Sequence, residues 1–135
     1  MGNPRETAVT VAHLVFGGVL QRFPNIRFCL SHGGGTVPMI AGRWQRGFDT
    51  KQPGVGARML PPATLLSTFY VDCLTHSPDA LACSAEIFGE RRLLFGSDWP
   101  FPMGLSQPHD YLARLPQLLR DQIYNVGPEQ LEPPC

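Results

Sequence analysis

Short apolar runs rich in β-branched and aromatic residues alternate along this chain with longer segments of helical pattern. The apolar runs predict strands at 26–31, 68–74 and 92–96. Helices are expected at 7–23, 37–48, 78–88 and 108–124, and a loop rich in Pro and Gly at 52–62. Strands that alternate with helices indicate βαβ units, so we expect one α/β domain over residues 1–135 with a parallel sheet.

Helix boundaries are marked by a few residues with clear roles. Asn3 is expected to cap the first helix, with Pro4 at its first position and Glu6 completing a capping box. Pro24 and Asn25 are expected to end that helix.

Composition and charge exclude some classes of function. The chain has 135 residues, of which 43% are hydrophobic and 16% charged, and its formal net charge is zero. That is enough apolar content for one core. The charge balance argues against nucleic acid as a partner, and the longest apolar run, 11–20, is too short to cross a membrane.

The four cysteines form no CxxC pair and no zinc-finger spacing. Cys29 and Cys73 lie in apolar runs, where a cysteine usually packs as a small hydrophobe. The start of the chain has no secretory pattern, so reduced thiols in a cytoplasmic protein are expected, Cys135 included.

Polar clusters follow two of the expected strands, with His32 after the first and Asp98 after the third. In (β/α)₈ barrels the active site is built from the loops at the carboxyl ends of the strands. A complete barrel needs about 250 residues and eight strands, so three strands would be only a part of one.

His32 and the three glycines that follow it have two interpretations. In lipase-like hydrolases an HGGG segment forms the oxyanion hole, but that mechanism requires a Gly-x-Ser-x-Gly elbow, which this sequence lacks. The other interpretation is a histidine presented at a strand end, with glycines that allow close approach of backbone or ligand.

Two motifs carry a family resemblance: SHGGGTVPMIAGR at 31–43 and FGSDWPFP at 95–102, with FYVD at 69–72 between them. With the motifs in this order, the chain resembles the amidohydrolase-related family of aminocarboxymuconate semialdehyde decarboxylase. The resemblance covers about residues 4–125. The resemblance implies a metal-dependent (β/α)₈ barrel, of which this chain would be the C-terminal part, about strands six to eight.

The resemblance also implies roles for individual residues. Asp98 matches an aspartate that binds the catalytic zinc, and His32 matches a histidine that handles protons beside the metal. Arg43 matches an arginine that, in the family's homodimers, reaches the neighbouring subunit's site and binds a substrate carboxylate. Trp99 is expected to form part of the pocket wall.

Other polar residues are expected to be structural. Asp72, within the second strand, is expected to be structural, although it could approach the site. His76 is expected to face solvent, although it could line a pocket. His109 is expected to lie at the surface, and His13 to be a core residue of the first helix.

The family's His-x-His pair and fifth-strand histidine have no counterpart here, so most metal ligands are missing. We therefore expect an incomplete fragment of a zinc-dependent carboxy-lyase that releases CO₂ from an unsaturated or aromatic carboxylic acid. A hydrolase or hydratase on the same scaffold is the nearest alternative, because fold and metal do not fix the reaction. A non-catalytic remnant is a third interpretation.

Overall fold

The computed structural model describes residues 2–56 and 58–131. A three-stranded parallel sheet runs through its centre in the order β1 (Cys29–Leu30), β2 (Tyr70–Asp72), β3 (Leu93–Leu94). The expected α/β class and parallel pairing are therefore confirmed. All three carboxyl ends face the same way, so the loops that follow the strands meet at one edge of the sheet.

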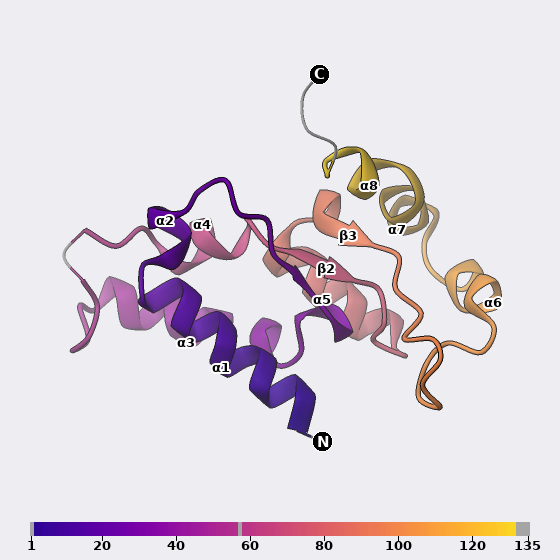
Figure 1. The fold of residues 1–135 in the computed structure, drawn as a ribbon, viewed down its shortest axis with the longest axis horizontal. Helices are drawn as coiled ribbons and strands as arrows, with labels where there is room; N and C mark the ends of the chain where they lie inside the picture. The colour runs from indigo at the N-terminus through magenta and orange to yellow at the C-terminus, as the bar shows by residue number, and fades with distance from the viewer. Residues whose placement is uncertain (1, 57, 132–135) are drawn as a thin grey trace.

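Helical segments surround the sheet (Figure 1). Their bounds are α1 Gly2–Phe16, α2 Val19–Arg22, η1 His32–Gly34, α3 Val37–Asp49, α4 Pro62–Leu66, α5 Pro78–Phe88, η2 Glu90–Arg92, α6 Pro108–Ala113, α7 Gln117–Asp121, the π-helical turn η3 Gln122–Val126, and α8 Gly127–Glu129. Helices α1 and α3 lie at one end of the molecule and α6 to α8 at the other.

Two expected helices are each interrupted. The first breaks after Phe16, where Gly18 adopts a left-handed φ of 71°, and restarts as α2. The last is divided by Pro116, whose missing N–H and ring oppose an uninterrupted helix. Asn3 lies inside α1, which begins at Gly2, so its expected role as the cap is wrong. By contrast, α5 has the predicted bounds, with the Ser77 hydroxyl capping the Ala80 N–H.

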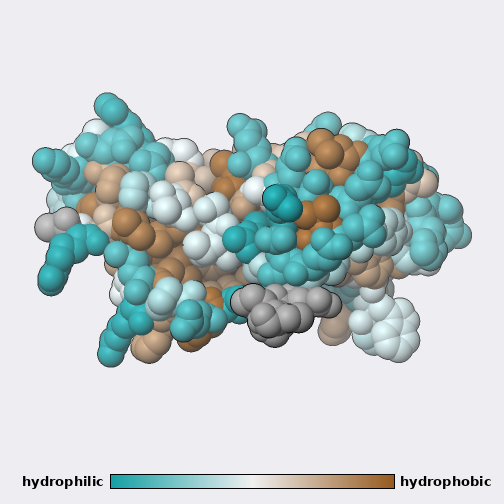
Figure 2. Space-filling model, turned by 90° about the horizontal axis from the view of Figure 1, so that it is seen from above, coloured by the Kyte–Doolittle hydropathy of each residue, from teal (hydrophilic) through white to brown (hydrophobic). Residues whose placement is uncertain are grey.

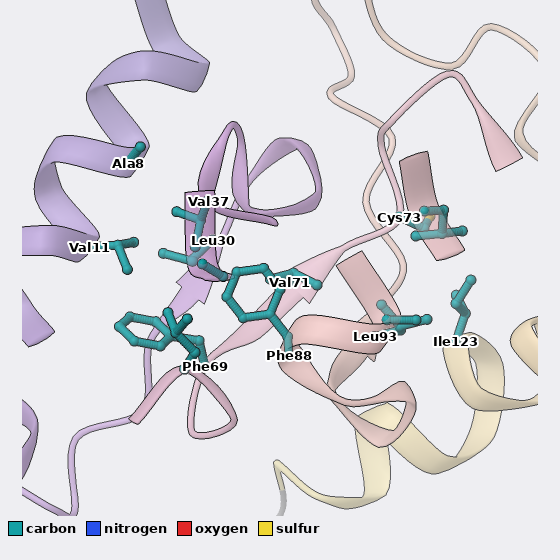
Figure 3. Close-up of a cluster of buried hydrophobic side chains, with 14 of the residues drawn as sticks. Ala8, Val11, Leu30, Val37, Phe69, Val71, Cys73, Phe88, Leu93 and Ile123 are labelled. Atoms are coloured by element: carbon teal, nitrogen blue, oxygen red, sulfur yellow. The ribbon is translucent and has the colours of Figure 1, made fainter. Parts of the chain in front are cut away.

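The core forms where the helices pack against one face of the sheet (Figure 3). Leu30, Val71 and Leu93 are all buried and share that face, because paired residues of a parallel sheet point the same way. Apolar side chains of the helices cover them, namely Ala8 and Val11 of α1, Val37 of α3, Phe88 of α5 and Ile123 of η3. This packing of apolar side chains is the main source of stability for the fold.

The strands are shorter than predicted because pairing, not composition, sets their ends. Among the strands of residues 2–56 and 58–131, β1 pairs with β2 alone. Tyr70 donates its N–H to the Phe28 carbonyl at 2.8 Å, and the register pairs Tyr70 with Cys29, so the backbone groups of Cys29 face the free edge. Cys29 is exposed at this edge, contrary to the expectation of a packed thiol, whereas Cys73 is buried as predicted.

Several large hydrophobic side chains are exposed, and Figure 2 shows hydrophobic patches between hydrophilic residues on one face. Met39, Phe101 and Met103 are each at least 66% exposed. His13 is exposed, so its expected place in the core is wrong, and His109 lies at the surface as predicted. Cys135 lies outside the described residues. None of the helices in 2–56 and 58–131 has the length and hydrophobicity that crossing a bilayer requires.

Candidate functional site

The turn that carries His32 begins directly after β1. Ser31 is extended, and the chain then enters η1 with left-handed backbone at His32 (φ 58°) and Gly33 (φ 60°). A left-handed histidine is uncommon and costs conformational energy, so the surrounding structure must hold it. Such strain often marks a functional position.

Close packing explains why glycines follow His32. A side-chain carbon at Gly34 would lie 2.5 Å from the ring of Phe88, and one at Gly35 would lie 2.5 Å from the Pro4 carbonyl oxygen. Both residues also have positive φ. Gly34 and Gly35 therefore let the His32 turn sit directly against α5 and α1.

Asp98 is presented in a comparable way after β3. It too has a left-handed backbone, with φ 59°. Its loop is closed by hydrogen bonds from the Phe101 N–H to the Asp98 carbonyl (2.9 Å) and from the Leu105 N–H to the Ser97 carbonyl (2.8 Å). In the same loop, the Trp99–Pro100 peptide bond is cis.

The two strand ends bring His32 and Asp98 together, as their positions in the sequence predicted. His32 Nε2 lies 3.9 Å from Asp98 Oδ2, and about a quarter of each side chain is exposed. That distance is longer than a hydrogen bond, so the two side chains approach each other without a direct hydrogen bond. Both residues line a cleft of about 530 Å³.

The cleft combines these polar groups with apolar walls. Leu74, Met39 and Met103 contribute apolar surface. His76 also lines it and is exposed, with a left-handed φ of 56°, so the expectation that it faces solvent and the alternative that it lines a pocket both hold. A pocket with apolar walls and a few converging polar groups is typical of a small-molecule site.

The other predicted site residues lie outside this cleft. Arg43 is exposed on α3, and Trp99 is 83% exposed. Neither lines the cleft in the single chain. Their roles in substrate binding remain predictions.

Sequence reasoning missed Ser84, which lies on α5 and lines the same cleft. Its buried hydroxyl lies 2.8 Å from the Gly33 carbonyl oxygen. No local signal marks this residue, because the contact joins positions 51 residues apart.

Two other titratable groups beside the site are perturbed. Burial raises the pKa of the Cys73 thiol above its ordinary value, a backbone hydrogen bond with Gly96 lowers it, and the nearby Asp72 charge raises it. Burial also raises the pKa of Tyr111, against a hydrogen bond with Thr75 that lowers it. Both groups are therefore neutral at physiological pH.

The residues present do not form a metal site by themselves. Among residues 2–56 and 58–131, no three His, Cys, Asp or Glu side chains converge in a way that could hold an ion. A catalytic zinc site generally takes three protein ligands. This part of the chain offers Asp98 with His32 beside it, which does not fit a complete metal centre.

Comparison with known proteins identifies relatives along most of the chain. The sequence model of a family described as amidohydrolase matches residues 1–132. The 2-amino-3-carboxymuconate-6-semialdehyde decarboxylase of Dictyostelium discoideum is 39% identical over 106 residues, covering 77% of this chain and 29% of the relative. A 2-keto-4-carboxy-3-hexenedioate hydratase from a Sphingobium species is 30% identical over 91 residues, covering 67% of this chain and 25% of that protein.

Solved structures agree on the fold. IDCase from Metarhizium anisopliae, in apo form, has a TM-score of 0.74 and 27% identity, over 90% of this chain and 38% of that one. A dihydroxybenzoic acid decarboxylase from a Polaromonas species, solved with bound manganese, has a TM-score of 0.74 and 21% identity, over 89% and 37% of the two chains. This chain thus spans well under half the length of the proteins that it matches.

Proposed function

Since this chain belongs to the amidohydrolase family, we propose that it forms the C-terminal part, about strands six to eight, of a barrel that removes CO₂ from an unsaturated or aromatic carboxylic acid. The observation that carries the proposal is the pairing of His32 with Asp98 at 3.9 Å in the cleft beyond the strand ends. The similarity to the Dictyostelium decarboxylase supports this reaction class.

His32 is the proton donor in this proposal. A protonated imidazole delivers its proton to the ring or double-bond carbon that carries the carboxylate. The bond between that carbon and the carboxyl group then breaks, its electron pair returns to the substrate, and CO₂ leaves. Water restores the proton to His32.

Further parts of the proposal concern residues outside the cleft and a metal for which the described part of this chain supplies too few ligands. We expect Arg43 to bind a substrate carboxylate across a homodimer interface, and Trp99 to cover the pocket. The whole enzyme would use zinc, with Asp98 as one ligand, and would act in the cytoplasm. The proton transfer above does not depend on these points.

A chimera tests the proposal on this chain's own residues. The segment of the Dictyostelium decarboxylase that aligns with this chain would be replaced by this chain, and CO₂ release would be measured from the decarboxylase's own substrate. We expect turnover, its loss in His32→Gln, and its retention in the surface control His109→Gln. In Arg43→Ala we expect a higher KM with little change in kcat.

The hydratase is the second candidate, supported by the similarity to the Sphingobium enzyme. In the same assay, addition of water to the substrate without CO₂ release would favour it. A folded chimera with neither reaction would contradict both, and would favour a non-catalytic remnant.

A further inference from the structure

Asp72 lies between the two loops that carry His32 and Asp98. It ends the central strand β2, where the register pairs it with Leu94 of β3 and places β1 on the other side. It is partly buried and does not line the cleft. A carboxylate in this place can influence both loops without touching a ligand.

One oxygen of Asp72 holds the His32 turn. Asp72 Oδ1 accepts a hydrogen bond from the Gly33 N–H at 2.9 Å, across 39 residues of sequence. The same oxygen accepts the Leu74 N–H at 3.1 Å, which orients the carboxylate within its own strand end. A local turn would need only the contact with Leu74, so the bond to Gly33 is the one that links two strand ends.

The bond acts where the backbone is strained. Gly33 directly follows His32, and both residues have left-handed φ angles. With its N–H bound to Asp72 and its carbonyl facing the Ser84 hydroxyl, the peptide groups on both sides of Gly33 are fixed. Contacts of this kind offset the cost of holding His32 in an uncommon conformation.

The other side of Asp72 contacts the segment between β3 and Asp98. A side-chain carbon at Gly96 would lie 2.7 Å from Asp72 Cβ and 3.0 Å from its Oδ2. Gly96 precedes Asp98 by two residues. The Asp72 side chain therefore packs against the backbone just after β3 and keeps a fixed spacing between the two loops.

We propose that Asp72 is a positioning residue, which sets the separation of His32 and Asp98 by binding the Gly33 N–H on one side and packing against Gly96 on the other. The inference rests on the proposed function only in taking His32 and Asp98 as the reacting pair. The coupling of Asp72 to the His32 turn is measurable without activity.

The experiment measures amide hydrogen exchange of the full chain at single-residue resolution in Asp72→Ala, Asp72→Asn and the exposed control Asp79→Asn on α5. In Asp72→Ala we expect the Gly33 amide to exchange at least tenfold faster than in the unmodified chain, while amides in α3 change less than twofold. Asp72→Asn keeps a carbonyl oxygen that can accept the Gly33 N–H, so it should restore most of the protection.

A second pair of variants changes the same contact from the segment after β3, and it covers the case in which Asp72→Ala does not fold. Gly96→Ala crowds the Asp72 side chain and should also raise the Gly33 exchange rate, whereas Gly42→Ala, with open space around its position, should not. Unchanged Gly33 exchange in Asp72→Ala and in Gly96→Ala would overturn the proposal. Equally faster exchange of amides throughout the chain in Asp72→Ala, with no recovery in Asp72→Asn, would overturn it too. That result would mean that Asp72 contributes only to the global stability of the fold.

The chimera separates this inference from the proposed function. There, Asp72→Ala should lower kcat at nearly constant KM, and Asp72→Asn should recover part of the loss. If the chimera has no activity while the exchange results hold, the proposed function fails and the coupling stands. If it is active and indifferent to Asp72→Ala, the positioning role is wrong.

Discussion

The hydroxyl of Ser84, on helix α5, donates a hydrogen bond to the carbonyl oxygen of Gly33 at 2.8 Å. The same hydroxyl lies 3.0 Å from the Ala80 carbonyl of the preceding helical turn. Because Gly33 directly follows His32, this contact links the position of the His32 side chain in the cleft to helix α5. The helix is thus part of the support of the site.

Ser84→Ala is therefore expected to destabilise the chain by about 1–2 kcal/mol, because it leaves the buried Gly33 carbonyl without this partner. Chemical denaturation provides the measurement. Ser106→Ala, at an exposed position, is the control and should change stability by less than about 0.5 kcal/mol. Equal stability of the two variants would show that the Ser84 bond contributes nothing.

A methyl group at Gly34 is expected to cost about 2–4 kcal/mol. It would meet the Phe88 ring at 2.5 Å in a residue whose φ is 80°. The matched change Gly42→Ala, on α3 with no atom within 4 Å of the new carbon, should stabilise by about 0.5–1 kcal/mol. Thermal or urea unfolding of both variants checks the pair, and a Gly34→Ala variant as stable as the unmodified chain would contradict the packing described for this turn.

The chain by itself is expected to hold no tightly bound zinc or manganese. The described residues offer no cluster of three ligands, and a metal held by one carboxylate and water dissociates readily. Elemental analysis of the purified chain, before and after dialysis against a chelator, gives the answer. One equivalent of metal that survives dialysis would mean that the site residues have been misassigned.

Stability is expected to fall as the pH rises above about 9, since the folded state raises the pKa of Cys73 above 9.0 and that of Tyr111 above 10.0. A group with a raised pKa binds its proton more tightly in the folded chain. Its contribution is present below the unfolded pKa and is lost as the pH rises through the folded one. Urea unfolding from pH 7 to 11 should show the decline, with a flatter curve in Cys73→Ala than in Cys83→Ala.

The isolated chain is expected to self-associate through the free edge of β1. The backbone groups of Cys29 face that edge, beside a groove of about 380 Å³ formed with α1. Unpaired strand edges favour pairing with another chain, and a lysine at the edge opposes it. Cys29→Lys should reduce the mass seen by light scattering more than Val9→Lys, which adds the same charge on α1. A monomeric unmodified chain would refute this expectation.

Much of the fold could be predicted because local signals agreed with the tertiary structure. Ser77, Pro78 and Gly89 mark the two ends of α5, and the structure has the predicted bounds. Strand ends were less predictable, since pairing with a neighbour decides where a strand stops. The pair Gly17 and Gly18 broke the first helix despite its continuous apolar pattern, because Gly18 can take the left-handed conformation.

By itself, the sequence determined the alternation of strands and helices and the placement of His32 and Asp98 directly after strands, because these depend on local propensity and on order along the chain. Only the tertiary structure decided that the two side chains lie 3.9 Å apart, and that Asp72 and Ser84 hydrogen-bond to Gly33 in the turn that carries His32. Those contacts join residues 39 to 66 positions apart, and their geometry depends on the register of the sheet and the packing of α5.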